Sequence, residues 1–177
     1  YATLNRRTGI SASTARGAAA LMGVTIATVV NAAWALVLHG RTGDEDVVFG
    51  VTTSGRSTGD EAEAETIGLL INTLPLRVKV KKAASVQAFV RDVHRAYTDM
   101  IPYEATALSD IQKWCDVRPI FDSAVFYENF PDPEDDDYES GGPQMEEVES
   151  AEHTDFKLSL IALTDTDLVL GLEYEGL

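Results

Sequence analysis

Two stretches of the chain repeat apolar residues every three or four positions, the spacing of one face of a helix. In residues 25–38 the face starts after Thr25, a good capping residue, and Gly40 lies just past its end. In residues 85–100 the face starts after Ser85, which can also cap a helix. The two faces consist of Ile26, Val29, Val30, Ala33, Trp34 and Val37, and of Val86, Phe89, Val90, Val93 and Tyr97. Both stretches predict helices that pack against a core.

Extended segments are predicted where apolar and polar residues alternate or where Val and Thr are frequent. Residues 46–54 and 121–129 fit this description, and residues 67–80 follow an extended pattern with apolar residues at 74, 76, 78 and 80. Pro75 has no backbone N–H to donate to a neighbouring strand. The pattern therefore predicts that residues 67–80 form a strand at a sheet edge or at a bulge.

The remaining elements complete the predicted order along the chain. Short helices are predicted over residues 16–22 and 108–114, the second with Ser109 as its cap. Strands over residues 156–163 and 167–174 flank Thr164-Asp165-Thr166, which suits a hairpin turn. The order is helices, strand, strand, helices, strand and hairpin. It predicts an α/β fold in which helices flank a mixed β-sheet.

Length, net charge and cysteine content exclude several classes of function. The length of 177 residues suits one domain or one lobe of a larger domain. The formal charge is −15, and eleven of the acidic residues lie in residues 132–155; outside that segment 14 basic residues face 18 acidic ones. This charge repels phosphate backbones and anionic membranes, so neither nucleic acid nor a membrane is an expected partner. No apolar run reaches the roughly 20 residues that span a bilayer, and no signal peptide is evident. Cys115 is the single cysteine, which fits an expected location in a reducing cytoplasm.

Several sequence blocks, in this order, resemble the C-terminal half of a nonribosomal peptide synthetase condensation domain. They are Gly23–Leu38, Gly43–Phe49, Val48–Arg56 (VFGVTTSGR), Ile67–Arg77 (IGLLINTLPLR) and Ile120–Pro131 (IFDSAVFYENFP). The resemblance covers residues 15–131 well and the rest loosely. It implies a chloramphenicol acetyltransferase-like half-domain over residues 1–177, one of two such lobes that meet in a V around a tunnel.

The resemblance also implies a function and a missing part. Condensation domains join a carrier-bound acyl or peptidyl thioester to a carrier-bound aminoacyl thioester, forming an amide in the biosynthesis of antibiotics and other secondary metabolites. Their His-His-x-x-x-Asp-Gly motif lies in the N-terminal lobe. In this chain His39, His94 and His153 are not adjacent to one another. No catalytic residue is therefore expected here, and the chain alone is expected to be inactive.

The expected partners follow from the same resemblance. They are the N-terminal condensation lobe, the upstream and downstream peptidyl carrier proteins, and the adenylation domain of the same synthetase. Phosphopantetheine is expected on the carrier proteins, and no cofactor is expected to bind this chain directly. The amino acids that are joined, the stereochemistry of the donor and the peptide product do not follow from the sequence.

Polar residues within the resembling blocks are the candidate site. Asn72 places an amide in an apolar run, where an unsatisfied amide costs about 1–3 kcal/mol. By resemblance Asn72 and Ser54 face the tunnel near the pantetheine arm and the acceptor amine. The alternatives are a structural amide satisfied by backbone groups, and a simple Ser-Gly turn. Arg56, Arg77 and Asn129 are expected to support the tunnel or to serve structure, with the arginines in ion pairs within the lobe.

Two segments match crossing elements of the family. Residues 55–66 correspond to the floor loop, and residues 132–150 correspond to the latch, which reaches toward the other lobe. The alternative for the acidic segment 132–150 is a solvated loop. A calcium loop starting at Asp132 would need Gly and Glu where Asp137 and Pro143 stand, so no metal site is expected.

Three other interpretations remain open. The chain could be a non-catalytic module that docks a carrier protein or dimerises. It could be an epimerization or heterocyclization relative, although the pair Asn72-Thr73 favours condensation over epimerization. A free-standing acetyltransferase would need its own catalytic histidine near the C-terminal end, and His153 in its acidic surroundings does not fit that role.

Overall fold

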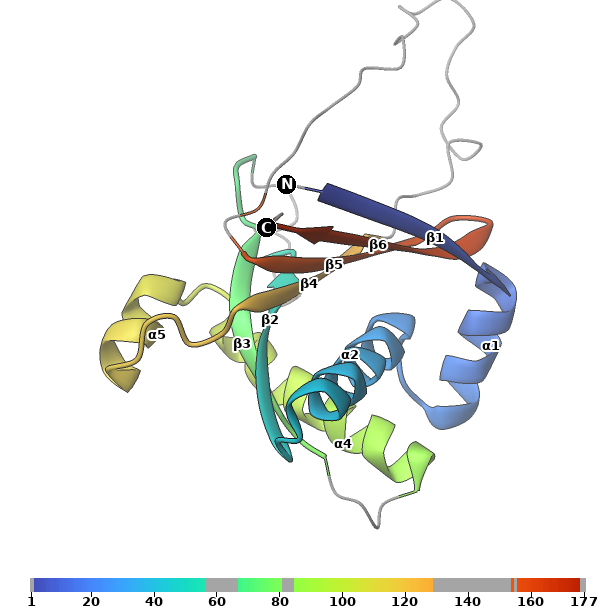
Figure 1. The fold of residues 1–177 in the computed structure, drawn as a ribbon, viewed down its shortest axis with the longest axis horizontal. Helices are drawn as coiled ribbons and strands as arrows, with labels where there is room; N and C mark the ends of the chain where they lie inside the picture. The colour runs from blue at the N-terminus through green and yellow to red at the C-terminus, as the bar shows by residue number, and fades with distance from the viewer. Residues whose placement is uncertain (1, 57–66, 81–84, 129–153, 155, 176–177) are drawn as a thin grey trace, which may run out of the picture.

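A computed structural model describes residues 2–56, 67–80, 85–128, 154 and 156–175. These residues form an α/β fold on a six-stranded sheet in the order β1-β6-β5-β4-β2-β3 (Figure 1). The strands are β1 (Ala2–Ser11), β2 (Asp46–Thr53), β3 (Asn72–Lys79), β4 (Ser123–Glu128), β5 (Leu158–Thr164) and β6 (Asp167–Tyr174). Strand β4 runs parallel to β2 and β5, and the other neighbouring pairs are antiparallel. The predicted mixed sheet flanked by helices is confirmed.

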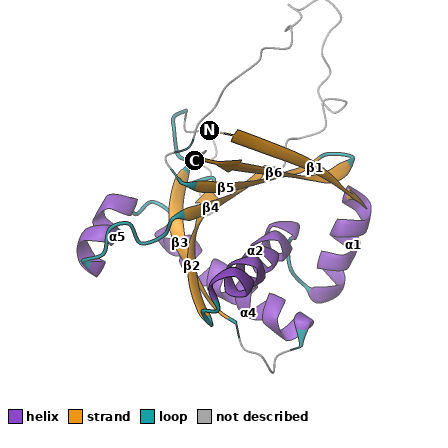
Figure 2. Ribbon diagram, viewed as in Figure 1, coloured by secondary structure: helices purple, strands orange, loops and turns teal. Residues whose placement is uncertain are grey.

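The helices are unequally divided between the two faces of the sheet (Figure 2). Helices α1 (Ala12–Met22), α2 (Ile26–Thr42) and α4 (Val86–Met100) cover one face. A 3₁₀ turn, η1 (Ile101–Tyr103), leads from α4 to α5 (Leu108–Cys115), which packs against the other face of β2 and β3. No single helix in the described ranges is long and apolar enough to cross a membrane; α1 and α2 reach that length and composition only as a pair bent by 85°.

The predicted caps account for the starts of two helices. The hydroxyls of Thr25 and Ser85 accept hydrogen bonds from the backbone N–H groups of Thr28 and Ala88. A capping bond of this kind satisfies one of the donors that a helix start leaves unpaired and contributes about 1 kcal/mol. Ser11 caps α1 in the same way, so this helix begins at Ala12 and not at residue 16.

The predicted end of α2 and the predicted cap of α5 are wrong. Helix α2 continues through Gly40 to Thr42 and ends at Gly43, whose φ of 81° is the left-handed conformation typical of a helix end. Gly40 and Gly43 both lie near the end of the apolar face, and the sequence alone does not show which of them takes the left-handed conformation. Helix α5 begins at Leu108 after Ala107, so Ser109 lies inside the helix and does not cap it.

The strand predictions differ from the structure at both ends of the sheet. The sequence gives no indication of β1, because its residues are mostly exposed and include the polar run Asn5-Arg6-Arg7. Strand β3 begins only at Asn72, and residues 67–71 are irregular. Pro75 lies opposite Gly50 of β2, and β3 is an edge strand, as its missing N–H predicts.

The core lies between α2, α4 and the inner face of the sheet. Phe49, Val51, Leu74, Leu76 and Val125 are almost fully buried there. The indole Nε1 of Trp34 donates a 3.2 Å hydrogen bond to the buried Ser123 Oγ, so the polar end of this core residue is satisfied. The central strands are therefore held by a well-packed core.

Candidate site at the ends of β2 and β3

The candidate site lies where β2 ends and β3 begins. Thr53 of β2 pairs with Asn72 of β3, and Ser54 and Gly55 follow directly. Gly55 has a φ of +68°, and a Cβ there would overlap the backbone carbonyl of Leu70. The Ser54-Gly55 turn thus lies against the segment that leads into β3. We call residues 54–55 and 70–72, with the backbone of residues 104–106, the strand-end site.

Asn72 is held by three hydrogen bonds to the backbone. Its Nδ2 donates to the carbonyl oxygens of Glu104 at 2.8 Å and Thr106 at 2.7 Å. Its Oδ1 accepts from the N–H of Thr73 at 2.9 Å. Both amide hydrogens are therefore used within the chain, and one lone pair of Oδ1 is left for another partner. The amide ties the start of β3 to the connection between η1 and α5.

Ser54 is exposed beside this clamp. Its Oγ accepts a 3.3 Å hydrogen bond from the backbone N–H of Arg56, which closes a tight turn. Among the described residues nothing accepts the hydroxyl hydrogen of Ser54 in return. Of the two tunnel candidates, Ser54 is thus the one whose polar hydrogen is available to a ligand. Arg56 is also exposed, two residues further along.

Arg77 lies at the other end of the β2–β3 pair. Its Nε and Nη2 donate to Oδ1 and Oδ2 of Asp46 at 2.9 and 2.7 Å. These hydrogen bonds lower the pKa of the Asp46 carboxyl and raise the pKa of Arg77. Arg77 lies five positions along β3 from Asn72, about 17 Å at ~3.3 Å per residue. Arg77 therefore serves a cross-strand ion pair remote from the strand-end site.

A buried acid lies next to the clamp and was not anticipated from the sequence. Glu104 is 3% exposed, and its backbone oxygen is one of the acceptors of Asn72. Burial, with the nearby charge of Glu104 as the smaller cause, raises the pKa of Tyr97. An acid is rarely this deeply buried. The signal in the sequence that could have pointed to this turn is Pro102, which lies just after an amphipathic helix and two residues before Glu104.

Exposed aliphatic residues lead into the site. Ile67, Leu69 and Ile71 are 100%, 89% and 62% exposed, although they stand directly before the buried half of β3. A cluster of large exposed apolar side chains is typical of a surface that a second domain or another protein covers. The strand-end site is therefore open and flanked by apolar surface.

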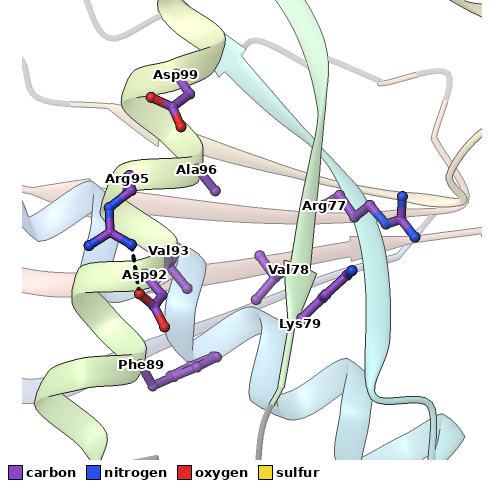
Figure 3. A pocket seen from close by; sticks show the side chains of 9 residues that line it. All are labelled: Arg77, Val78, Lys79, Phe89, Asp92, Val93, Arg95, Ala96 and Asp99. Atoms are coloured by element: carbon purple, nitrogen blue, oxygen red, sulfur yellow. Dashed lines mark hydrogen bonds and ion pairs between the residues drawn. The ribbon is translucent and has the colours of Figure 1, made fainter.

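A hollow of about 290 Å³ lies between the edge strand β3 and α4 (Figure 3). Val78, Phe89 and Val93 form its apolar part, and Arg95 pairs with Asp92 at 3.1 Å on its rim. Its wall includes Arg77, so it belongs to the far end of the β2–β3 pair. In the ranges that the structure describes, no three His, Cys, Asp or Glu side chains gather where they could hold a metal ion.

The described histidines lie elsewhere. His39 Nδ1 contacts the backbone oxygen of Asp44 at 2.7 Å, and His94 Nδ1 contacts Thr28 Oγ1 at 3.0 Å. Neither contact involves a residue of the strand-end site. Asn129, His153, most of the floor-loop segment 55–66 and all of the latch segment 132–150 lie outside the described residues.

A model of the condensation domain matches residues 9–176. The chain belongs to the condensation domain family. This confirms the family to which the sequence blocks point; which lobe the chain forms remains a prediction. A linear gramicidin synthase of Brevibacillus parabrevis is 40% identical over 156 residues, 86% of this chain and 3% of that protein. Chondramide synthase cmdD of Chondromyces crocatus is 39% identical over 134 residues, 72% of this chain and 3% of that protein.

Solved condensation domains share the fold. The domain from the monacolin K polyketide synthase MokA superposes with a TM-score of 0.75 at 17% identity, over 98% of this chain and 41% of that one. The first condensation domain of the calcium-dependent antibiotic synthetase, in complex with a substrate analogue, gives 0.70 at 24% identity, over 98% and 39%. The chain thus spans about two fifths of these structures and a few per cent of the curated relatives.

Proposed function

We propose that this chain is the C-terminal lobe of a condensation domain that forms amide bonds in nonribosomal peptide synthesis. The observation that carries the proposal is the open strand-end site, with its exposed segment 67–71 and with the adjacent histidine pair of the family missing from the sequence. An open polar turn flanked by exposed aliphatic side chains suits one side of a cleft whose other side is formed by a second lobe. The match to about two fifths of each solved condensation-domain chain supports the same interpretation.

The proposed reaction joins two substrates that carrier proteins deliver on phosphopantetheine arms. The amine nitrogen of the acceptor aminoacyl thioester attacks the carbonyl carbon of the donor acyl or peptidyl thioester. The C–N bond forms, the C–S bond breaks, and the donor thiolate leaves and takes up the proton that the amine loses. The product is an amide on the acceptor carrier protein, longer by the donor group.

The contribution of this lobe is positioning. Ser54 presents an available hydroxyl hydrogen at the end of β2, where it can hold the acceptor amine or a thioester oxygen. Asn72 keeps the connection at residues 104–106 fixed beside it, so Asn72 acts through the backbone while one lone pair of its Oδ1 remains for the pantetheine arm. Holding two reactants in line lowers a barrier by up to about 7–11 kcal/mol. The imidazole that assists the attack belongs, in this proposal, to the N-terminal lobe.

The partners follow from the proposed reaction. They are the N-terminal lobe, the upstream and downstream peptidyl carrier proteins and the adenylation domain of the same synthetase, and we place the assembly in the cytoplasm. Residues 55–66 and 132–150 are proposed to cross to the other lobe as floor loop and latch.

The experiment fuses this chain behind an N-terminal lobe that carries His-His-x-x-x-Asp-Gly and supplies donor and acceptor carrier proteins loaded with amino acids. The fusion is expected to form the dipeptidyl thioester on the acceptor carrier protein, and replacement of the second histidine by alanine is expected to remove most of this product. The control Ser109→Ala in the same fusion, at an exposed position of α5 outside the strand-end site, is expected to form product like the unsubstituted fusion. A fusion that folds, binds both carriers and still forms no amide contradicts the proposal.

A second function has support from the same apolar segment. Exposed Ile67, Leu69 and Ile71 also suit a non-catalytic module that dimerises. Size-exclusion chromatography with light scattering separates the two: a dimer that persists on dilution supports the module, and a monomer supports the lobe.

A further inference from the structure

A second hollow, of about 440 Å³, lies on the helical side of the sheet, far along it from β3. Residues of α1, α2 and the strands β1, β6 and β5 line it. Figure 1 shows α1 and α2 on this side of the sheet. Its wall is almost wholly aliphatic and includes Ile10, Ala18, Val29, Ala33, Leu168 and Leu170. Its size lies in the range of small-molecule sites, about 300–1,000 Å³.

The hollow exists because the helical layer does not close over this end of the sheet. Phe49 and Val51 of β2 and Val125 of β4 are fully covered by helices, whereas Leu168 and Leu170 of β6 stay half-buried. Helix α1, which stands over them, presents small side chains such as Ala15 and Ala18. Short side chains on the helix leave room between it and the leucines.

The polar groups in the wall are already engaged. Thr8 Oγ1 donates to the backbone oxygen of Leu168 at 2.7 Å, and Thr14 Oγ1 bonds to Ser11 Oγ at 2.8 Å. The lining contains no aromatic ring for stacking. The part of a ligand inside the hollow must therefore be apolar, and an aliphatic chain matches the wall best.

A cation lies on β1, the strand that contributes Thr8 and Ile10 to the wall. Arg6 pairs in register with Leu170, and cross-strand partners project to the same face of a sheet. Arg6 is exposed, and among the described residues no carboxylate lies within ion-pair distance of it. Its neighbour Arg7, on the other face, pairs with Asp167 at 3.7 Å. Although the whole chain is strongly acidic, residues 1–43 contain four arginines and no Asp or Glu.

We propose that this hollow binds a straight-chain aliphatic carboxylate. The chain lies against Leu168 and Leu170 between α1 and α2, and the carboxylate pairs with Arg6 at the mouth. The site is separate from the strand-end site, so the proposal does not depend on the proposed reaction. Burial of the aliphatic chain contributes most of the binding free energy. The exposed ion pair with Arg6 contributes less and favours an anionic head group over a cationic one.

Isothermal titration of the purified chain with decanoate, below its micelle concentration, tests the proposal. We expect saturable binding of one decanoate per chain, weakened at least tenfold by Ala18→Phe and by Ala33→Phe, which fill the hollow from exposed positions. Ala20→Phe, on the same helix but outside the wall, is expected to bind like the wild type. Circular dichroism shows whether each variant keeps the fold.

A second set of titrations tests whether Arg6 selects an anionic head group. Arg6→Gln is expected to weaken decanoate about three- to tenfold without weakening decyltrimethylammonium, and the matched control Arg7→Gln is expected to change neither. Absence of saturable binding, or equal binding by folded filling variants, overturns the site. Equal effects of the two arginine substitutions on decanoate overturn the role of Arg6.

Discussion

Asn72 donates a 2.8 Å hydrogen bond from its side-chain amide to the backbone oxygen of Glu104, 32 residues further along the chain. With its second bond, to Thr106, it joins the start of β3 to the connection before α5. This clamp fixes residues 104–106 to the start of β3, whose register partner Thr53 directly precedes Ser54. Asn72 therefore stabilises the fold, whether or not it also contacts substrate.

Replacement of Asn72 by alanine should lower the free energy of unfolding by about 1–3 kcal/mol, because the carbonyls of Glu104 and Thr106 lose their donor. Asn72→Asp should cost more, because it sets a carboxylate against two carbonyl oxygens. Urea unfolding measures both. Gln87→Ala, at an exposed position of α4, is the control and should change stability by less than about 0.5 kcal/mol. An Asn72→Ala variant as stable as the wild type contradicts the clamp.

Ser54→Ala should slow amide formation by the fused domain about tenfold, equivalent to about 1.4 kcal/mol, with little effect on stability. The reason is that the hydroxyl is exposed and its hydrogen has no acceptor among the described residues. Single-turnover rates with loaded carrier proteins measure the effect. An unchanged rate with saturated carriers shows that Ser54 only closes the turn at Arg56.

Gly55→Ala should destabilise the chain by about 1–3 kcal/mol, because its φ is positive and a Cβ would overlap the carbonyl of Leu70. Gly68→Ala, in the same neighbourhood, is the matched control, since a Cβ there meets nothing within 4 Å. Thermal unfolding compares the two variants. Similar melting temperatures for both would show that the Gly55 turn does not constrain the strand-end site.

The ion pair of Arg77 with Asp46 should be visible as a pH effect. Because the folded-state pKa of Asp46 is lowered, the pair stabilises the fold above the unfolded pKa of about 3.9 and loses its effect as the pH falls through the folded value. Arg77→Gln should raise the pKa of Asp46 toward its ordinary value, as followed by NMR titration of the carboxyl carbon. Lys113→Gln, which removes the partner of Asp110, should leave Asp46 unchanged. An unaltered Asp46 titration in Arg77→Gln would exclude the pair in solution.

Replacement of Ile67, Leu69 and Ile71 together by serine should abolish association with an N-terminal condensation lobe while leaving the isolated chain folded. These side chains are mostly exposed, so their loss costs little in the chain itself, but each contributes apolar area when a partner covers it. Titration calorimetry with the separate N-terminal lobe measures the association. Leu21→Ser, at an exposed position of α1, is the control and should bind like the wild type. Equal binding by the triple variant would place the interface elsewhere.

Local patterns predicted those parts of the fold whose causes are local. Ser85 and the apolar face behind it define α4 to within one residue, and the alternation at residues 167–174 coincides with β6. Strand β1 was missed because only its pairing with β6 makes it a strand; its own residues are exposed and polar. The hydrogen bonds of Asn72 join residues more than 30 positions apart, and no local pattern contains that information.

The central claim is that this chain supplies one wall of a reaction site whose imidazole lies on another wall. The most direct test measures dipeptidyl thioester formed from loaded carrier proteins in three samples: this chain, an N-terminal lobe with the two-histidine motif, and both together. We predict product only in the third sample. Product from this chain alone would contradict the claim.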